Sequence, residues 1–556
     1  MGSEKRWWLR RKICELLLWC WIGQDKNIDW MLSLGPDPNL PSRPSPSSFL
    51  VGLRLQRGGR ERRRERRNGF QTSKKGMGIE KHLRLSFSFF FFVLFFFLLL
   101  ISPVARLRRW QWTSRVLHCR EGAEVDIIDR LPTPFGLVRS GVAPDHPETK
   151  IVINQFSRVA VDQRCSFFGN VTLGASISLS ELRELYHVVV LAYGAESDRV
   201  LGVPGEDLAG IYSAREFVWW YNGHPDCNTL SPDLRTTDTA IVLGQGNVAL
   251  DVARVLLRDS AALATTDIAE HALVALAESS IRKVYLVGRR GPAQAACTAK
   301  ELREILGIKN LHVHIQEADL KLSYLDEEEL KNSRIQKRVY ELFCKGASQH
   351  LNTTSCQREL HFVFFRKPDS FLQSDTEGRV SGVHLEKTVL KETGTGKQSA
   401  FGSGQFEDLQ AGLVLKSIGY KSLSIDGLPF DSHRVPNIRG RVLRDGSEPH
   451  LLEKGLYVAG WLKRGPTGII ATNLYCSEET VYSISEDIEQ GKFTETADMR
   501  LGRAGLVQLL ENRGITYVTF SDWEKIDCIE RAAGNRKNKP REKIASWGEL
   551  LRAAKA

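Results

Sequence analysis

The chain has 556 residues, enough for two or three domains with sizeable cores, and its 42% hydrophobic and 26% charged residues are typical of a globular protein. The net charge of +11 favours an acidic partner or an anionic surface, although much of the excess lies in one basic run, Arg60 to Arg67. Because no zinc-finger or RNP-type motif accompanies that charge, we expect no nucleic-acid partner.

Residues 1–104 differ in composition from the rest and end in an apolar run. Residues 85–101 are seventeen residues, mainly Phe and Leu with two serines, at the short limit of a membrane span. Three interpretations remain open: a membrane anchor, a fragment of a targeting sequence, or translated non-coding DNA. We favour the third interpretation, because a pyrimidine-rich tract of DNA encodes a run of Phe and Leu residues. Membrane contact stays uncertain, and no clean transit peptide is visible.

The orderly part of the sequence begins near residue 123 with a strand that ends in an acid. Residues 125–128 are predicted to form this strand, and Asp129 then has the position of a ribose-binding carboxylate in a dinucleotide-binding fold. A first strand and a Gly-rich turn should precede it, and neither pattern is present. Beyond it we expect helices at 151–160 and 179–186, and strands at 171–173 and 188–195.

A second dinucleotide-binding pattern is complete. Residues 240–243 are a short apolar run typical of a buried parallel strand. Gly244, Gly246 and Ala249 follow with the spacing G-x-G-x-x-A, and a helical pattern starts at once. The first glycine permits a tight turn, the second lets the backbone approach a pyrophosphate, and the small third residue lets helix pack on strand. We expect a dinucleotide here; a merely tight turn is the alternative.

The end of the next strand indicates which dinucleotide binds. Residues 284–288 form an apolar run that ends in Arg289 and Arg290, after helical segments at about 250–263 and 266–280. An acid at this point would hold the ribose 2′-hydroxyl of NAD, whereas arginines suit the 2′-phosphate of NADP. The alternative is a solvated surface pair. We therefore predict NADP.

The rest of the chain alternates helical and strand patterns up to a return crossing. The expected helices are 298–305 and 327–345, and the expected strands are 311–314, 360–365, 380–387, 413–418 and 456–460. Residues 461–473 are predicted to be a turn leading into a helix, and the tail from Met499 to be helical and charged.

From Glu124 onward the sequence resembles the mitochondrial NADPH:adrenodoxin (ferredoxin) reductases, FAD flavoproteins related to glutathione reductase. The matching motifs are Val125-Asp-Ile-Ile-Asp-Arg, Pro134-Phe-Gly-Leu-Val-Arg139, Gly141-Val-Ala-Pro-Asp-His-Pro147, Gly244-Gln-Gly-Asn-Val-Ala-Leu-Asp251, Gly288-Arg-Arg-Gly-Pro292, Ser417-Ile-Gly-Tyr-Lys421 and Gly460-Trp-Leu-Lys-Arg-Gly-Pro-Thr-Gly-Ile-Ile-Ala-Thr-Asn473. The resemblance implies an α/β fold with two Rossmann-like domains, the FAD domain being interrupted by an inserted NADP domain. The expected boundaries are 1–104 (extension), 105–198 (FAD domain, first part, damaged at 105–122), 199–420 (NADP domain) and 421–556 (FAD domain, second part, and tail).

The resemblance also implies a reaction and a set of site residues. Hydride would pass from NADPH to FAD, and single electrons from FAD to an acidic [2Fe-2S] ferredoxin, in a mitochondrial and monomeric protein. The implied FAD contacts are Asp129, Leu137, Leu173, Trp461, Gly468, Ile469 and Ile470. The NADP contacts are Gly244, Gln245, Gly246, Asn247, Val248, Arg289, Arg290 and Glu301. His146 and Asp251 would be a polar pair near the flavin, with either a structural or a catalytic role. The candidate residues for docking the ferredoxin are Arg282, Lys300, Arg303 and the 333–338 cluster.

The family pattern requires an FAD turn before Asp129, and residues 105–119 stand in its place. Reading residues 110–119 one base later can give Gly-Ser-Gly-Pro-Ala-Gly-Phe-Tyr-Thr. We therefore hypothesise that the FAD motif is encoded but translated out of frame; a diverged linker is the alternative.

Two other classes of protein stay open at this point. The first is a different NADPH-dependent flavoprotein reductase acting on a disulfide, which would need a C-x-x-C motif, and none of the ten cysteines forms one. That absence also argues against a structural zinc or an iron–sulfur cluster of the chain's own, so no metal site is expected. The second is a non-catalytic or FAD-deficient, membrane-associated relative.

Overall fold

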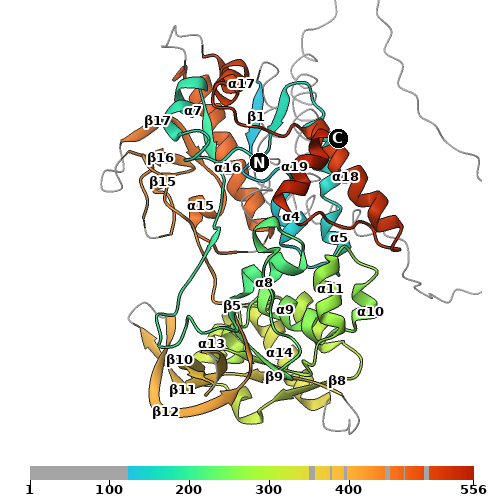
Figure 1. Cartoon of the computed structure of the whole chain (residues 1–556). Coiled ribbons are helices and arrows are strands. Elements are labelled where there is room, and N and C mark those ends of the chain that lie inside the picture. Colours follow the sequence, from blue (N-terminus) through green and yellow to red (C-terminus); the bar gives the residue numbers. More distant parts are fainter. Residues whose placement is uncertain are drawn as a thin grey trace, which may run out of the picture. The chain divides into compact units, whose positions relative to one another are not determined.

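The computed structural model describes residues 123–349, 357–375, 378–393, 397–431, 433–444, 451–468, 470–493 and 500–556 (Figure 1). The apolar run 85–101 and the segment 105–122 lie outside these residues, so the interpretations placed on them are not tested. Within the described ranges, no helix is both long and apolar enough to cross a membrane.

The larger of the two halves of the fold is built on a six-stranded parallel sheet, in the order β5-β13-β6-β7-β9-β8. Its strands are β5 (Ile211–Ser213), β6 (Thr239–Leu243), β7 (Lys283–Val287), β8 (Leu311–Ile315), β9 (Arg358–Val363) and β13 (Leu413–Lys416). Alternate residues of β6, β7 and β9 form one apolar core with helices α8 (Ala214–Tyr221), α9 (Asn247–Leu257), α11 (Glu270–Ala277), α12 (Ala299–Leu306) and α14 (Arg334–Gln349). This α/β arrangement confirms the predicted fold class.

The other face of the same sheet is partly covered by a three-stranded antiparallel sheet (Figure 1). It consists of β10 (Arg366–Gln373), β11 (Val380–Thr393) and β12 (Lys397–Gln410). Phe371, Val383 and Leu385 from this sheet pack on Ile241 and Val287 of the parallel one. The sequence predicted part of β11 and missed β10 and β12, because their polar and exposed positions give no clean alternation.

The second half of the fold contains two smaller sheets. In the first, β1 (Val125–Ile128) pairs in parallel with β2 (Cys165–Phe168). In the second, β3 (Val189–Leu191) pairs in parallel with β17 (Leu452–Val458), which continues antiparallel into β16 (Arg441–Leu443) and β15 (Asn437–Ile438). The predicted strand at 171–173 is wrong. The strand lies at β2, where Phe167 packs into the core, and Asn170, at φ 63°, already turns the chain.

The remaining elements are short connections and helices. They are α4 (Gly136–Ser140), α5 (Pro147–Lys150), α6 (Ile153–Ala160), α7 (Leu179–Leu185), α10 (Ser260–Leu263), α13 (Tyr324–Asn332), α15 (Trp461–Arg464), α16 (Ile470–Glu489), α17 (Gly502–Asn512), α18 (Phe520–Asn535) and α19 (Trp547–Lys555). The predicted helix at 327–345 is thus two helices, α13 and α14, separated at Ser333, whose backbone is extended. The tail from residue 500 is helical, as expected.

The chain crosses between the two halves twice, and the two crossings pair. Strands β4 (Ser197–Asp198) and β14 (Tyr420–Lys421) form a short antiparallel ribbon. The predicted domain boundaries, 198/199 and 420/421, fall at this ribbon; the division into an FAD domain and an NADP domain stays our proposal.

The C-terminal tail is anchored by a buried ion pair. Glu530 of α18 is fully buried and accepts hydrogen bonds from the Arg139 guanidinium (2.7 Å), from Arg541 (3.1 Å) and from the Ile544 backbone (2.9 Å). Arg139 is itself only 6% exposed. Breaking such a pair leaves an uncompensated buried charge.

We therefore expect Glu530→Gln to lower the free energy of unfolding by about 3 kcal/mol. The measurement is urea denaturation followed by circular dichroism. Glu549→Gln, at an exposed position of α19, is the matched control and should change stability by less than about 0.5 kcal/mol. Equal effects of the two substitutions would contradict an anchoring role for Glu530.

Candidate functional site

The turn between β6 and α9 has the geometry of a phosphate-binding loop. Gly244 has φ +133°, and a Cβ there would lie 2.3 Å from the Ser417 carbonyl oxygen, so no larger residue fits. Nothing lies within 4 Å of the Cβ position of Gly246, which begins α9. The first glycine therefore makes the turn, and the second leaves its outer side open to a ligand at the helix N-terminus.

The side chains around this turn brace it. Gln245 is 8% exposed and donates from Nε2 to the carbonyls of Leu286 (3.1 Å) and Val363 (3.2 Å), which fixes the turn to the sheet. The Asn247 side chain accepts from the Thr298 backbone N–H at 2.7 Å. The carboxylate of Glu301 accepts a hydrogen bond from the Thr298 hydroxyl. Val248 is half-buried against the core of the sheet. The structure thus brings together the six predicted NADP contacts around this turn, which are Gly244, Gln245, Gly246, Asn247, Val248 and Glu301. Glu301 is connected to the turn by its hydrogen bond with Thr298.

Two arginines stand at the end of the neighbouring strand. Arg289 is exposed and Arg290 half-buried, and they follow β7, which pairs with β6. Across the part of the chain that the structure describes, neither guanidinium has an ion pair or a hydrogen bond, although the charge of Glu329 acts on Arg290. The pKa of Arg290 is lowered by burial and by the positive charge of Arg289. Two adjacent guanidiniums at this sheet edge suit the 2′-phosphate of NADP, and their role as an anion site stays a prediction.

The residues predicted to form a polar pair have different partners. His146, which is 9% exposed, lies with Nε2 2.8 Å from the Glu304 carboxylate of α12. Asp251 pairs with Arg254 of its own helix at 2.8 Å. Burial raises the pKa of Asp251, against the opposing effect of the charges of Arg254 and His146. The sequence did not single out Glu304 or Arg254, because both partnerships depend on tertiary contacts.

Arg254 is the centre of this network. Its side chain is 2% exposed and donates to Asp145 from Nε (2.7 Å) and Nη2 (3.0 Å), while Arg258 donates to the same carboxylate at 2.6 Å. Burial alone would raise the pKa of Asp145, but these hydrogen bonds hold it at about 2. The network joins the loop after α4 to helix α9.

A cavity of 490 Å³ opens beside Asp129, between β1 and β3. Residues of both strands line it, as does Leu173. Among the described strands, β1 pairs only with β2, and β3 only with β17, so both free strand edges face the cavity. In a doubly wound sheet of order 3-2-1-4, the first strand lies between the second and the fourth. The cavity occupies that position.

Of the other residues expected at the flavin, Trp461 lies at the second chain crossing, whereas Leu137 lies in α4. Trp461 is 8% exposed and stacks on Tyr420, with ring centroids 5.4 Å apart. Gly468 has φ +85°, just before α16 begins at Ile470. Leu137 packs, partly buried, against a separate core beneath α4. Ile469 lies outside the described residues.

These positions test how well FAD fits the chain. Asp129 is buried and accepts from the Leu131 N–H at 3.1 Å, which orients its carboxylate at the cavity. Asp129 and the segment from Trp461 to Gly468 suit the two ends of the cofactor. For its pyrophosphate, the described residues on this side offer no Gly-rich turn at the end of a strand. On the NADP side the structure thus describes the turn and both arginines, and on the expected FAD side it describes Asp129, Trp461 and Gly468.

The basic docking candidates differ in whether their charged groups are already bound to other residues. The Lys300 ammonium is 3.0 Å from Glu148, and the Arg282 guanidinium donates to the carbonyls of Ser279 and Ile281. Arg303 and the cations of the 333–338 cluster are exposed on α12 and α14: Arg334, Lys337 and Arg338. Whether a partner docks there stays a prediction.

Comparison with known proteins agrees with this geometry. The mitochondrial NADPH:adrenodoxin oxidoreductase of Arabidopsis thaliana is 66% identical over 446 residues, which are 79% of this chain and 92% of that protein. The human protein of the same name is 44% identical, covering 79% of this chain and 89% of its own. The structure of Mycobacterium tuberculosis FprA in complex with NADPH is 38% identical, with a TM-score of 0.75 over 82% of this chain and 98% of that one. No protein-family model matches the chain.

The fold is that of a Rossmann-type oxidoreductase with two dinucleotide-binding modules. The chain belongs to the NADPH:adrenodoxin oxidoreductase family. A disulfide reductase and a non-catalytic protein are not favoured by these relatives.

The arginine pair should set the preference for NADP. We expect Arg289→Ala together with Arg290→Ala to weaken NADP⁺ binding by roughly 10- to 100-fold and to leave NAD⁺ binding nearly unchanged, because charge-assisted bonds to the 2′-phosphate are lost. The measurement is isothermal titration with each nucleotide. Arg282→Ala is the control, since its guanidinium is bound to backbone carbonyls. An equal loss for both nucleotides would assign the pair a structural role instead.

The Asp145 network should make stability depend on pH. A carboxylate whose pKa is lowered in the folded state stabilises the protein above its unfolded pKa, and that contribution is lost as the pH falls through the folded value. Asp145 should therefore contribute roughly 2 to 3 kcal/mol at pH 6 that disappears between about pH 4 and pH 2.

Asp145→Asn tests this dependence by denaturant unfolding across that range. The two proteins should differ most near neutral pH and converge in acid. A difference that stays constant with pH would show that the carboxylate charge is not the cause.

Proposed function

We propose that this protein is a mitochondrial oxidoreductase that takes electrons from NADPH and delivers them, through FAD, to an iron–sulfur ferredoxin. The observation that carries the proposal is the Arg289–Arg290 pair, which makes no ion pair among the described residues, beside the open Gly244–Gly246 turn. The chain is 66% identical to a mitochondrial NADPH:adrenodoxin oxidoreductase. FprA, a 41% identical relative, is named an NADPH-ferredoxin reductase.

The chain's own residues would bind and orient the two cofactors. The β6–α9 turn and the arginines hold NADP, and Asp129 with the segment from Trp461 to Gly468 holds the ends of FAD. When bound, the flavin accepts a hydride and releases single electrons, so the protein needs no nucleophile of its own. The buried His146–Glu304 and Asp251–Arg254 pairs are our candidates for positioning polar groups near that reaction.

The charge and the cluster type of the ferredoxin partner are part of the same proposal. An acidic [2Fe-2S] ferredoxin would complement the exposed cations of α12 and α14, since opposite charges steer association. We propose that the protein acts as a monomer.

The cavity between β1 and β3 supports the frame-shift hypothesis for residues 105–119. Tryptophan has the single codon TGG, so reading Trp110 and Trp112 one base later gives a codon beginning GG, which is always glycine. A G-x-G is therefore forced at these two positions. It lies 19 residues before Asp129, close to the spacing of about 20 expected between such a turn and the ribose-binding acid.

Residues 105–109, which precede that turn, encode a strand-like segment when they are read one base later. Ala105 to Arg109, if encoded by GCG CGT CTG CGT CGT, read one base later as Arg-Val-Cys-Val-Val. Such a β-branched, apolar run is typical of a buried parallel strand. It would pair with the free edges of both β1 and β3. We propose that the active form carries this strand and turn.

Two versions of the full chain test this proposal. One has the sequence as written, and the other has residues 105–119 replaced by the segment encoded one base later. We expect the restored chain to bind about one FAD per chain, seen as flavin absorbance, and to reduce a [2Fe-2S] ferredoxin with NADPH in preference to NADH. The chain as written should retain less than about a tenth of that flavin, because the pyrophosphate turn is missing.

The outcomes separate the two parts of the proposal. Full flavin occupancy in the chain as written would refute the frame shift and leave the function standing. A restored chain that binds FAD and oxidises NADPH, but reduces no ferredoxin, would refute the function.

A further inference from the structure

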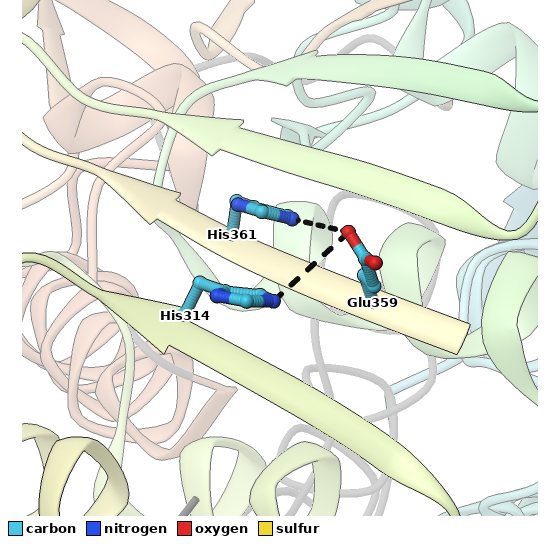
Figure 2. A group of neighbouring side chains, drawn as sticks. All are labelled: His314, Glu359 and His361. Carbon is cyan, nitrogen blue, oxygen red and sulfur yellow. Dashed lines mark hydrogen bonds and ion pairs between the residues drawn. The ribbon is translucent and has the colours of Figure 1, made fainter. Parts of the chain in front are cut away.

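Three side chains with metal-binding groups meet on the exposed edge of the parallel sheet. His314 comes from β8, and Glu359 and His361 come from β9. The strands pair in register, with His314 opposite His361 and His312 opposite Glu359. Because side chains alternate across a strand, these residues share one face of the sheet. Figure 2 shows the two imidazole rings lying side by side and directed toward the Glu359 carboxylate.

The distances are those of a cluster held close together. His361 Nε2 is 2.8 Å from the nearer oxygen of Glu359, and His314 Nε2 is 4.0 Å from the same oxygen. The two rings are stacked, with centroids 4.1 Å apart and planes 10° from parallel. One ligand atom from each residue lies within 4.8 Å of the other two.

One nitrogen of the cluster makes no hydrogen bond, although it lies 4.0 Å from the Glu359 carboxylate on a side chain that is 39% exposed. His314 Nε2 is buried and has no hydrogen bond within the described part of the chain. Leaving a buried polar atom without a hydrogen bond is unfavourable, and such atoms in folded proteins call for an explanation. A bound cation between the rings and the carboxylate would supply one.

We propose that His314, Glu359 and His361 bind one divalent transition-metal ion, with zinc as the best fit. Two imidazole nitrogens and a carboxylate oxygen are a donor set that zinc takes up, with a fourth position for water. The His312 ring lies next to that of His314, with centroids 4.0 Å apart. Because zinc bonds are about 2.0–2.2 Å long, binding requires the ligand atoms to move to within roughly 3.3 Å of one another.

One charge competes with the metal. Lys283 of β7 lies opposite Glu359, with its ammonium 3.4 Å from the carboxylate. The Lys283 side chain is 36% exposed, so it can turn outward into solvent when a cation binds. Tyr285, the next residue of β7 on this face, contacts the His361 ring. Removal of the Lys283 charge should therefore strengthen metal binding, which a merely structural cluster would not predict.

The place of the cluster in the fold indicates its effect. β8 is the edge strand of the six-stranded sheet, and its pairing with β9 is its only strand contact among the described residues. A metal shared by the two strands would cross-link this edge. Since a ligand that binds only the folded state stabilises it, zinc should raise the melting temperature.

The test is isothermal titration of the full chain with zinc chloride, together with thermal unfolding and cobalt absorption spectra. We expect one zinc per chain at this cluster and a higher melting temperature with zinc. The cobalt complex should lack a thiolate charge-transfer band, which distinguishes the cluster from the chain's cysteines. His361→Gln and His314→Gln should each weaken zinc binding at least about 100-fold, since loss of a secondary contact alone costs 10- to 100-fold.

A matched control and an opposite variant sharpen the result. His384 pairs with Asp408 on the antiparallel sheet, and among the described residues this pair belongs to no group of three metal-binding side chains, so His384→Gln should leave zinc binding unchanged. Lys283→Met should tighten binding several-fold. The proposal is refuted if millimolar zinc does not bind, if His361→Gln and His384→Gln have equal effects, or if the cobalt spectrum shows thiolate ligation. Circular dichroism confirms that each variant is folded.

Discussion

A buried guanidinium needs carboxylates within hydrogen-bond distance, and Arg254 has two of them. One, Asp251, lies one turn away on α9, the helix that begins at the phosphate-binding turn. The other, Asp145, lies in the loop next to His146, which in turn contacts Glu304 of α12. The helix that presents the NADP turn is therefore tied to the loop expected near the flavin. Any displacement of α9 along its axis would leave one of these charges unpaired.

The same reasoning explains why the NADP side could be predicted from the sequence and its supports could not. Gly244, Gly246 and the arginines after β7 are recognisable because a turn, a strand end and a residue type coincide within a few positions. Glu304 and Asp145 carry no such local mark, since each acquires its role from a residue more than a hundred positions away. The strand expected at 171–173 failed for a related reason: so short a segment, with two apolar residues around Thr172, fits equally well a strand and the loop that follows one.

The cavity beside Asp129 lies where the sheet would hold one more strand. Parallel strands in an α/β protein are paired on both edges except at the ends of the sheet. Here β1 and β3 each have one free edge among the described strands, and both edges line the same cavity. Local folding of β1, β2 and their helices survives because their apolar cores lie elsewhere, against α18 and α19 or against α7 and α17. The position where we expect the pyrophosphate of FAD thus lies apart from both of these cores.

The two faces and the edge of the six-stranded sheet carry different kinds of residues. Its core face is closed by helices, and the turn and arginines occupy the ends of the central strands β6 and β7. The antiparallel sheet covers the opposite face around Ile241 and Val287, which leaves the face of β8 and the start of β9 to polar residues. Histidines at alternate positions can gather there without disturbing the core, because Leu360 and Phe362 point the other way. A metal at that edge would therefore act on the stability of the sheet, while the cofactor site at its centre keeps its own geometry.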